Sequence, residues 1–261
     1  MTIIEAAISG VVQGLTEFLP VSSSGHLVLL SKFFGENENA LLFDVALHAG
    51  TLAALVIYFW KDILRLAKAF FVQSALTKPA RLIAVATIPA IIAGTLLQGF
   101  AEDTFRSAVL VAVNMMLMGG MMLWAERLAT QQTSKLEKVT TKQALVMGFA
   151  QALAVIPGVS RSGSTITAGL FVGLDRVTAT RFSFLLGIPI ISGALLKVLL
   201  DGGLESIGTQ AGVFLIGIFA AFLSGLFAIK FMLSYLSKHS LAVFAYYRIA
   251  LGIVVLLVVL L

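Results

Sequence analysis

The sequence lacks cysteine and is poor in charged residues. Without cysteine, the chain can form no disulfide, no thiolate metal site and no cysteine nucleophile. Charged residues make up 12% of the 261 residues, whereas an ordinary soluble domain contains about a quarter. Hydrophobic residues make up 59%, an excess that a soluble fold cannot bury but that lipid accommodates. The composition therefore excludes an ordinary soluble domain and predicts a membrane protein.

The sequence also lacks a contiguous basic stretch, although its net charge is +5. Lysine and arginine occur in short segments between apolar runs, where basic residues report the orientation of a membrane protein. Nucleic-acid binding calls for basic residues clustered on one face. We therefore predict no nucleic-acid partner and take the lipid bilayer as the surrounding partner.

Six apolar runs are each about 20 residues long, the length that a helix needs to cross a bilayer. They cover approximately 41–60, 81–99, 107–124, 179–200, 211–231 and 241–261. We predict an all-α polytopic, multi-pass membrane protein with six transmembrane helices, built as a single membrane domain over residues 1–261.

Two further apolar stretches, residues 3–34 and 143–173, are interrupted in the middle by polar residues, glycine and proline. Irregular backbone at membrane depth is tolerated only where it is buried in protein or lines a wet cavity. Each stretch is therefore predicted to be a re-entrant helical hairpin, which dips into the membrane and returns.

The two interrupted stretches are copies of each other at a spacing of 138 residues. Between positions 10 and 25, seven of 16 residues recur 138 positions later, whereas composition alone would give about one or two matches. The matches include Gln13 with Gln151 and Gly25 with Gly163. Since three apolar runs follow each copy, the chain is predicted to be a duplication with repeats at about 1–125 and 140–261.

Basic residues predict how the chain is oriented in the membrane. Segments 61–81 and 125–142, together with Lys230 and Lys238, are predicted to be cytoplasmic. The segments at the opposite ends of the spans are acidic and contain Glu36, Glu38, Glu102, Asp103, Asp201 and Glu205. Because three crossings per repeat is an odd number, the second repeat must be inverted relative to the first. The two hairpin tips should then meet near the midplane, as in other inverted-topology repeats.

The first hairpin tip carries ionisable and hydroxyl side chains, which are costly in a membrane and therefore indicate function. Gln13 and Glu17 lie four residues apart, on one face of the incoming helix. Three serines at 22–24 precede the outgoing helix, and His26 lies three residues after the middle one, close enough for its imidazole to approach that hydroxyl. The free N–H groups at this helix start, favoured by Gly25, would bind an anion.

The second tip carries a positive charge. Arg161 lies between Ser160 and Ser162 at the start of the second outgoing helix, and under the spacing of 138 it corresponds to Ser23. A pseudo-two-fold axis between the tips would bring this hydroxyl and this guanidinium together. A hydroxyl nucleophile facing a bidentate guanidinium is an arrangement suited to a phosphoryl group.

Two motifs resemble the signatures of the undecaprenyl-diphosphatase (bacitracin-resistance) family. One is Gln13-xxx-Glu17 with Leu19-Pro20-Val21-Ser22-Ser23-Ser24-Gly25-His26, and the other is Pro157-Gly158-Val159-Ser160-Arg161-Ser162-Gly163-Ser164-Thr165. The resemblance runs the length of the chain. It implies hydrolysis of undecaprenyl diphosphate to undecaprenyl phosphate and inorganic phosphate, which recycles the carrier lipid of cell-wall synthesis. It also implies a divalent cation, Mg²⁺ or Ca²⁺, and an active site in the bacterial inner membrane that opens toward the periplasm.

The resemblance also implies roles for individual residues. Ser23 would be the nucleophile, and His26 its base or the acid for the departing group. Glu17 would orient His26 or hold the cation together with Gln13, and Arg161 would bind the diphosphate. The remaining predicted substrate contacts are Gln13, Ser22, Ser24, Gly25, Ser160, Ser162 and Thr165. A homodimer is also predicted.

Two other functions fit parts of the pattern. Inverted repeats are equally typical of transporters, so a polyprenyl-phosphate transporter or flippase is the main alternative. A transporter needs no nucleophile, however, and Ser23, His26 and Glu17 together favour an enzyme. An intramembrane serine protease would use Ser23 and His26, but a protease stabilises its oxyanion with neutral donors and has no evident use for Arg161.

Two other polar positions are weaker candidates. Asp44 and His48 lie four residues apart at the outer end of a span. Arg248 lies inside the last apolar run beside Tyr246 and Tyr247, and its long side chain is predicted to extend to the cytoplasmic interface.

Overall fold

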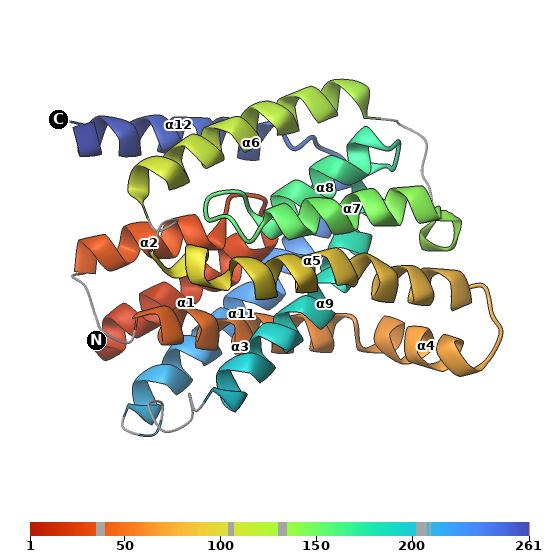
Figure 1. Ribbon diagram of the computed structural model, residues 1–261, viewed down its shortest axis with the longest axis horizontal. Helices are drawn as coiled ribbons and strands as arrows, with labels where there is room; N and C mark the ends of the chain where they lie inside the picture. Colours follow the sequence, from red (N-terminus) through yellow and green to blue (C-terminus); the bar gives the residue numbers. More distant parts are fainter. Residues whose placement is uncertain (35–39, 104–106, 130–134, 202–207, 209, 261) are drawn as a thin grey trace.

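The computed structural model describes residues 1–34, 40–103, 107–129, 135–201, 208 and 210–260, and this part of the chain folds into eleven α-helices and one 3₁₀ helix (Figure 1). The α-helices are α1 (Ile3–Phe18), α2 (Ser23–Phe34), α3 (Ala40–Tyr58), α4 (Trp60–Phe71), α5 (Thr77–Asp103), α6 (Ala108–Leu128), α7 (Thr141–Leu153), α8 (Arg161–Phe171), α9 (Arg176–Leu200), α11 (Ala211–Leu236) and α12 (Ala242–Leu260). The 3₁₀ helix η1 (Leu136–Lys138) precedes α7.

Long apolar helices make up most of the fold. Within the described ranges, five helices are long and apolar enough to cross a bilayer, namely α5, α6, α9, α11 and α12. The sixth predicted span is α3, which meets the same criterion together with α4, although the two helices are bent by 78° at their junction. The prediction of an all-α polytopic membrane protein is therefore confirmed.

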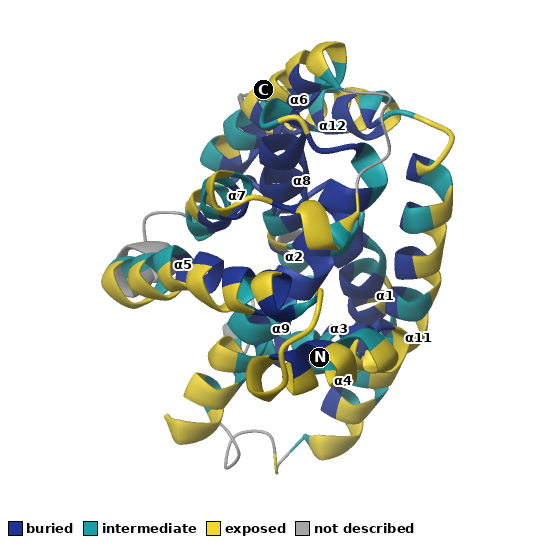
Figure 2. Ribbon diagram, turned by 90° about the vertical axis from the view of Figure 1, so that its right-hand side faces the viewer, coloured by how far each residue is buried: buried dark blue, intermediate teal, exposed yellow. Residues whose placement is uncertain are grey.

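The outer surface of the molecule is apolar. Exposed residues cover the outward faces of the peripheral helices, whereas buried residues gather at the centre around α8 (Figure 2). The exposed side chains include Leu96, Phe219, Phe227 and Val258, each more than half exposed. Such a surface is stable against lipid and not against water, because it would leave too much apolar area in contact with solvent.

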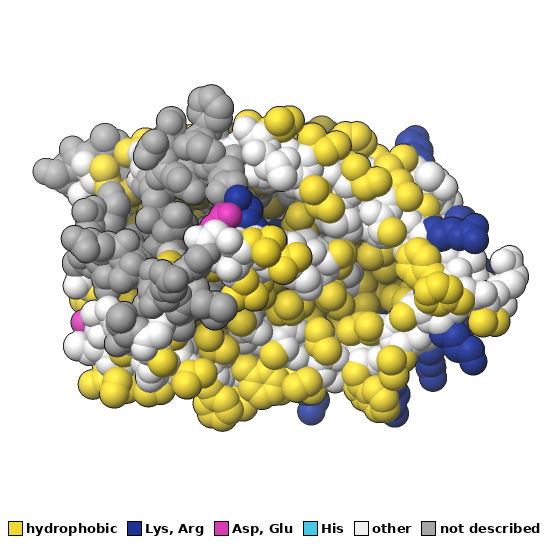
Figure 3. Space-filling view, turned by 60° about the horizontal axis from the view of Figure 1, so that its bottom comes forward, with side chains coloured by type: hydrophobic (Ala, Val, Ile, Leu, Met, Phe, Trp, Pro, Cys, Tyr) yellow, Lys and Arg dark blue, Asp and Glu magenta, His cyan; other side chains and the backbone are white. Residues whose placement is uncertain are grey.

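Lysine and arginine side chains gather at one end of the molecule, the end formed by α4 and the start of α5 (Figure 3). This distribution agrees with the two basic segments that the sequence assigns to one side of the membrane. Of the acidic residues predicted for the other side, Glu36, Glu38 and Glu205 lie outside the described residues, as do the side chains of Glu102 and Asp103.

Both interrupted stretches are helix–break–helix units, as predicted. Residues 19–22 separate α1 from α2, and residues 154–160 separate α7 from α8. Figure 1 shows the two units entering from opposite ends of the molecule, with their breaks near its middle. Both incoming helices begin with the same capping box, in which Thr2 pairs with Glu5 and Thr140 pairs with Gln143. These two caps are separated by the same 138 residues as the sequence repeat.

Each incoming helix packs against a long helix from the other half of the chain. Helix α1 lies against α11, and α7 lies against α5. At Gly10 an added Cβ would overlap the backbone carbonyl of Gly217, and at Gly148 it would overlap that of Ala86. Small residues let helix backbones approach closely in membrane proteins. This exchanged packing joins the two halves into one core and holds both breaks at its centre.

Arg248 corrects one prediction. Its side chain is fully buried, with 0% of its surface exposed, and does not reach the cytoplasmic interface. The guanidinium donates hydrogen bonds to the carbonyls of Pro20 (3.0 Å), Gly158 (2.6 Å), Val159 (2.9 Å) and Met115 (3.3 Å). The carbonyls of Pro20, Gly158 and Val159 lie in the two breaks, where the interrupted helices leave acceptors without helical partners. The side chain of Arg248 therefore stays in the interior, because it donates hydrogen bonds to these carbonyls.

Candidate active site

Glu17 is the centre of a buried polar cluster where the two breaks meet. Its side chain is 6% exposed, and each carboxylate oxygen has a different set of partners. Oε1 accepts a hydrogen bond from Nη2 of Arg161 at 2.8 Å. Oε2 accepts from the hydroxyl of Ser23 at 2.8 Å and from the amide of Gln13 at 3.1 Å. The predicted site residues of both hairpins therefore share one carboxylate.

Arg161 is held in place by the second half of the chain. Its Nη1 donates to the carbonyl of Ser183 in α9 at 3.2 Å, while Nη2 makes the ion pair with Glu17. A Cβ added to Gly187 of α9 would overlap the guanidinium. The guanidinium therefore packs closely against α9 and bonds Oε1 of Glu17, whereas the hydroxyl of Ser23 bonds Oε2.

The two breaks end in matching turns. Ser22 and Ser160 have φ angles of 75° and 74°, in the left-handed region that non-glycine residues rarely adopt. Each hydroxyl then accepts a hydrogen bond from the N–H three residues on, that of Gly25 at 3.3 Å and that of Gly163 at 3.1 Å. Strained backbone of this kind is concentrated at functional sites. The turns start α2 and α8 at the point where the cluster lies.

His26 has different partners from the one suggested by its spacing to Ser23. Nδ1 lies 2.7 Å from the carbonyl of Ser22, and because a carbonyl only accepts, Nδ1 donates. Nε2 lies 2.7 Å from the hydroxyl of Tyr247 in α12, and the two rings are nearly parallel. Both ring nitrogens of His26 are thus engaged, while Ser23 donates to Glu17. Sequence reasoning missed Tyr247, since only packing brings α12 beside α2.

His48 of α3 belongs to the cluster although the sequence ranked it low. Its Nε2 lies 3.6 Å from Oε2 of Glu17, and its Nδ1 lies 2.9 Å from the carbonyl of Asp44. The sequence signal for His48 was a histidine inside an apolar span, because ionisable residues in membrane helices usually have a function.

Several predicted substrate contacts are engaged within the protein. The hydroxyl of Ser162 donates to the carbonyl of Leu19 at 3.2 Å and so links the two breaks. Thr165 is fully buried, and its hydroxyl lies 2.7 Å from the carbonyl of Arg161 and 2.6 Å from the hydroxyl of Ser183. Ser24 is exposed, and its hydroxyl lies 3.3 Å from that of Ser22. In this structure, therefore, Thr165 positions the start of α8, whereas Ser24 is accessible.

A divalent cation fits the donor set at Gln13 and Glu17. The amide oxygen of Gln13 and Nε of Arg161 are two of the six buried side-chain atoms in the described residues that have no hydrogen-bond partner. The described part of the chain contains no cluster of three or more His, Cys, Asp or Glu side chains that could bind a metal. Mg²⁺ commonly takes one or two protein oxygens and completes its shell with substrate phosphates and water. An amide oxygen and one carboxylate meet that requirement.

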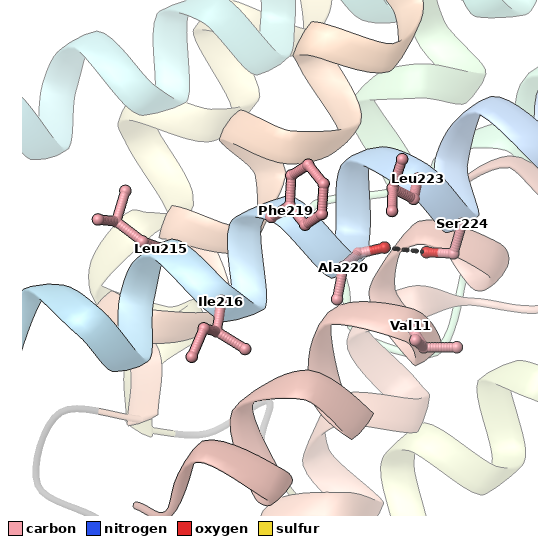
Figure 4. Close-up of a pocket in the computed structure, with 7 residues that line it drawn as sticks. All are labelled: Val11, Leu215, Ile216, Phe219, Ala220, Leu223 and Ser224. Atoms are coloured by element: carbon pink, nitrogen blue, oxygen red, sulfur yellow. Dashed lines mark hydrogen bonds between the residues drawn. The ribbon is translucent and has the colours of Figure 1, made fainter.

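A cavity of about 490 Å³ lies elsewhere, between α1 and α11 (Figure 4). Its lining consists of Val11, Leu215, Ile216, Phe219, Ala220, Leu223 and Ser224. The hydroxyl of Ser224 donates to the carbonyl of Ala220 at 2.7 Å within its own helix (Figure 4). This lining has no ionisable group, so the cavity offers apolar surface and no catalytic chemistry.

Known proteins share this sequence over nearly its whole length. A sequence model of the family described as bacitracin resistance protein BacA matches residues 6–254. The chain is 44% identical to an undecaprenyl-diphosphatase of Moorella thermoacetica over 265 residues, which cover 99% of this chain and 98% of the relative. It is 45% identical to an undecaprenyl-diphosphatase of Gemmatimonas aurantiaca, with coverage of 98% and 97%. This chain therefore belongs to the bacitracin resistance protein BacA family.

Proposed function

We propose that this protein hydrolyses undecaprenyl diphosphate to undecaprenyl phosphate and inorganic phosphate. The family and its full-length relatives, which carry the name undecaprenyl-diphosphatase, support this activity. The observation that carries the proposal is the shared carboxylate of Glu17, which binds a serine hydroxyl on one oxygen and a guanidinium on the other. A nucleophile, a base and a guanidinium that can bind an anion thus lie together inside a membrane protein.

Ser23 is the proposed nucleophile and Glu17 its base. The hydroxyl of Ser23 already donates to Oε2 of Glu17 at 2.8 Å, within the range that a general base requires. Attack forms a bond from Oγ of Ser23 to the terminal phosphorus and breaks the bond to the bridging oxygen. The electron pair leaves with undecaprenyl phosphate, and the serine proton passes to Glu17. Glu17 releases that proton to solvent and is ionised again. Water then attacks the phosphoserine, Glu17 carries one proton from this water to Oγ of Ser23, and the bond from Oγ to phosphorus breaks to release inorganic phosphate.

Arg161 is proposed to bind the phosphate oxygens on which charge develops. Phosphoryl transfer depends mainly on positioning and on stabilising that charge. The guanidinium and Ser23 bond different oxygens of Glu17, so a phosphate that reaches both would exchange the ion pair of Arg161 with Glu17 for two charge-assisted hydrogen bonds. The free N–H groups at the starts of α2 and α8 would contribute further donors.

Mg²⁺ or Ca²⁺ is the proposed cofactor, held by the amide oxygen of Gln13 and the carboxylate of Glu17. Such a cation would neutralise diphosphate charge and orient the phosphate groups. His26, fixed by Ser22 and Tyr247, is proposed to act on the departing group as an acid and not on Ser23.

We further propose that the chain is one membrane domain of two inverted repeats in the bacterial inner membrane, with the active site opening toward the periplasm. The matching caps, the matching turns and the exchanged packing of α1 and α7 support the repeats. The basic residues gathered at one end support the orientation. A homodimer stays a prediction, which the mass of the purified protein in detergent would test.

A polyprenyl-phosphate flippase is the second candidate. The observation that favours it is the entry of the two helix–break–helix units from opposite ends of the molecule (Figure 1), an arrangement on which alternating access is built in transporters. A vesicle assay with the Ser23→Ala protein separates the two functions. Movement of prenyl phosphate between leaflets without hydrolysis would support the flippase.

Phosphate release from undecaprenyl diphosphate by purified protein tests the enzyme proposal. Ser23→Ala should abolish release, whereas Ser31→Ala on the same helix should leave it unchanged, since that hydroxyl only bonds the carbonyl of Val28. If the Ser23→Ala protein still released phosphate, the proposed reaction would stand but Ser23 would not be its nucleophile. Absence of release by the wild type would favour the flippase.

A further inference from the structure

We propose that His48 is a positioning residue, which holds the carboxylate of Glu17 in line with the hydroxyl of Ser23. The kinetic part of this inference rests on the proposed function. The contact between His48 and Glu17 can be tested without it. His48 acts through Glu17 and is not itself proposed to touch the substrate.

The ring of His48 is oriented by its own helix. Nδ1 lies 2.9 Å from the carbonyl of Asp44, one turn earlier in α3, and donates to it because a carbonyl only accepts. This bond leaves Nε2 as the nitrogen that faces the cluster, 3.6 Å from Oε2 of Glu17. Catalytic hydrogen bonds are often long in the free enzyme and shorten when substrate binds. Because Nδ1 already donates and a carboxylate only accepts, Nε2 can donate to Glu17 when the ring carries both protons, and a small movement then completes the hydrogen bond.

The part of α3 that carries His48 is tightly packed. Leu47 and Thr51, on either side of it, are fully buried. A Cβ at Gly50 would overlap the carbonyl of Ile218 in α11, so α3 and α11 are in direct backbone contact there. Because these neighbours fix the rotation of α3 about its axis, His48 has little freedom to turn away from Glu17.

Substrate binding makes this contact more important. In the structure Arg161 holds Oε1 of Glu17, and the proposed reaction draws that guanidinium toward the phosphate. Of its side-chain partners in the structure, Glu17 would then keep those at Oε2, namely Gln13, Ser23 and His48. His48 is the one of the three that comes from outside the first hairpin. It therefore ties the base to the surrounding helices while the arginine is engaged elsewhere.

Two substitutions at His48 and two at a matched control test the role in catalysis. His48→Leu removes the hydrogen bond, and His48→Gln restores a polar group at similar reach. His239 makes the same bond from Nδ1 to the carbonyl four residues earlier, at 3.2 Å, but lies exposed in the loop before α12. The controls His239→Leu and His239→Gln should therefore retain wild-type activity.

For His48→Leu we expect kcat to fall about tenfold, as for the loss of one hydrogen bond to a charged group. KM should change little, because the substrate does not contact His48. His48→Gln should recover most of kcat. Equal kcat in His48→Leu and wild type would overturn the proposal, as would equal loss in His48→Leu and His48→Gln, since size alone would then explain the effect.

Nuclear magnetic resonance of ¹⁵N-labelled imidazoles tests the contact without any activity. The chain has three histidines, so single substitutions assign every signal. Glu17→Gln should shift the Nε2 signal of His48 and leave that of His239 unchanged. An unshifted His48 signal would overturn the inference. Failure of the wild type to release phosphate would instead count against the proposed function. The resonance measurement would still decide whether His48 contacts Glu17.

Discussion

Ser22 and Ser160 adopt the same left-handed backbone conformation, with φ of 75° and 74°, at equivalent places in the two breaks. Each also caps the helix that follows, through its hydroxyl and an N–H three residues on. The last turn of each break is therefore the same in backbone conformation, although the first break has four residues and the second has seven. The catalytic groups differ, because position 23 is serine and position 161 is arginine.

The left-handed turn at Ser160 predicts that replacement by alanine destabilises the protein more than replacement by glycine. Ser160→Ala loses the helix cap and keeps a Cβ in the left-handed region, whereas Ser160→Gly loses the cap but relieves the strain. We expect the alanine variant to be the less stable of the two by about 1 kcal/mol. Thermal unfolding of both proteins in the same detergent measures this. A more stable alanine variant would show that the backbone at Ser160 is not strained.

Arg161 should matter to activity at least as much as His26. Arg161→Ala removes the group proposed to bind the transferring phosphate, and losses of about 100-fold or more are usual for such donors. Arg161→Lys should restore only part of the rate, because one ammonium cannot reproduce the two separate contacts to Glu17 and Ser183. Initial rates of phosphate release compare these variants with His26→Ala. A wild-type rate in Arg161→Ala would remove the arginine from the mechanism.

Gly187 provides a test that leaves the charged residues unchanged. In Gly187→Ala the new methyl would overlap the guanidinium of Arg161 and displace it from Glu17. We expect a loss of activity of about 100-fold, as for other small misplacements of catalytic groups. Gly193→Ala in the same helix is the matched control, since a Cβ there meets nothing within 4 Å. Similar rates for the two variants would mean that Arg161 tolerates displacement.

Arg248 is predicted to stabilise the fold. Arg248→Lys leaves buried carbonyls of the two breaks without a donor, because an ammonium cannot reach all of them. The expected cost is roughly 3 kcal/mol, seen as a lower unfolding temperature. The exposed Arg65 of α4 offers a control, in which the same substitution should have little effect. Unchanged stability in Arg248→Lys would contradict this role.

Removal of divalent cations should stop the reaction. Chelation of the purified protein is expected to abolish phosphate release, and added Mg²⁺ or Ca²⁺ to restore it, because a diphosphate at this site carries charge that Arg161 alone does not neutralise. In Gln13→Leu, which lacks the amide oxygen, more cation should be needed for half-maximal rate. Full activity in chelator would exclude a cation from the mechanism.

The architecture was predictable because its signals are local or periodic. Six apolar runs and two interrupted stretches are properties of short segments, and each corresponds to helices in the structure. The membrane environment strengthens this link, since backbone groups in lipid must form helices or closed sheets. The motifs also identified Glu17, Ser23 and Arg161, which the structure brings together.

The partners of each side chain depended on tertiary structure. The spacing of Ser23 and His26 allows a contact, but α12 supplies Tyr247 to His26 and leaves Ser23 to Glu17. Arg161 and Glu17, 144 residues apart, meet only because α1 and α7 pack on helices of the opposite half. The sequence by itself determined which segments are helical and which residues carry chemistry. Only the packing of the helices decided which of those residues touch, because contact depends on which face of each helix its neighbours cover.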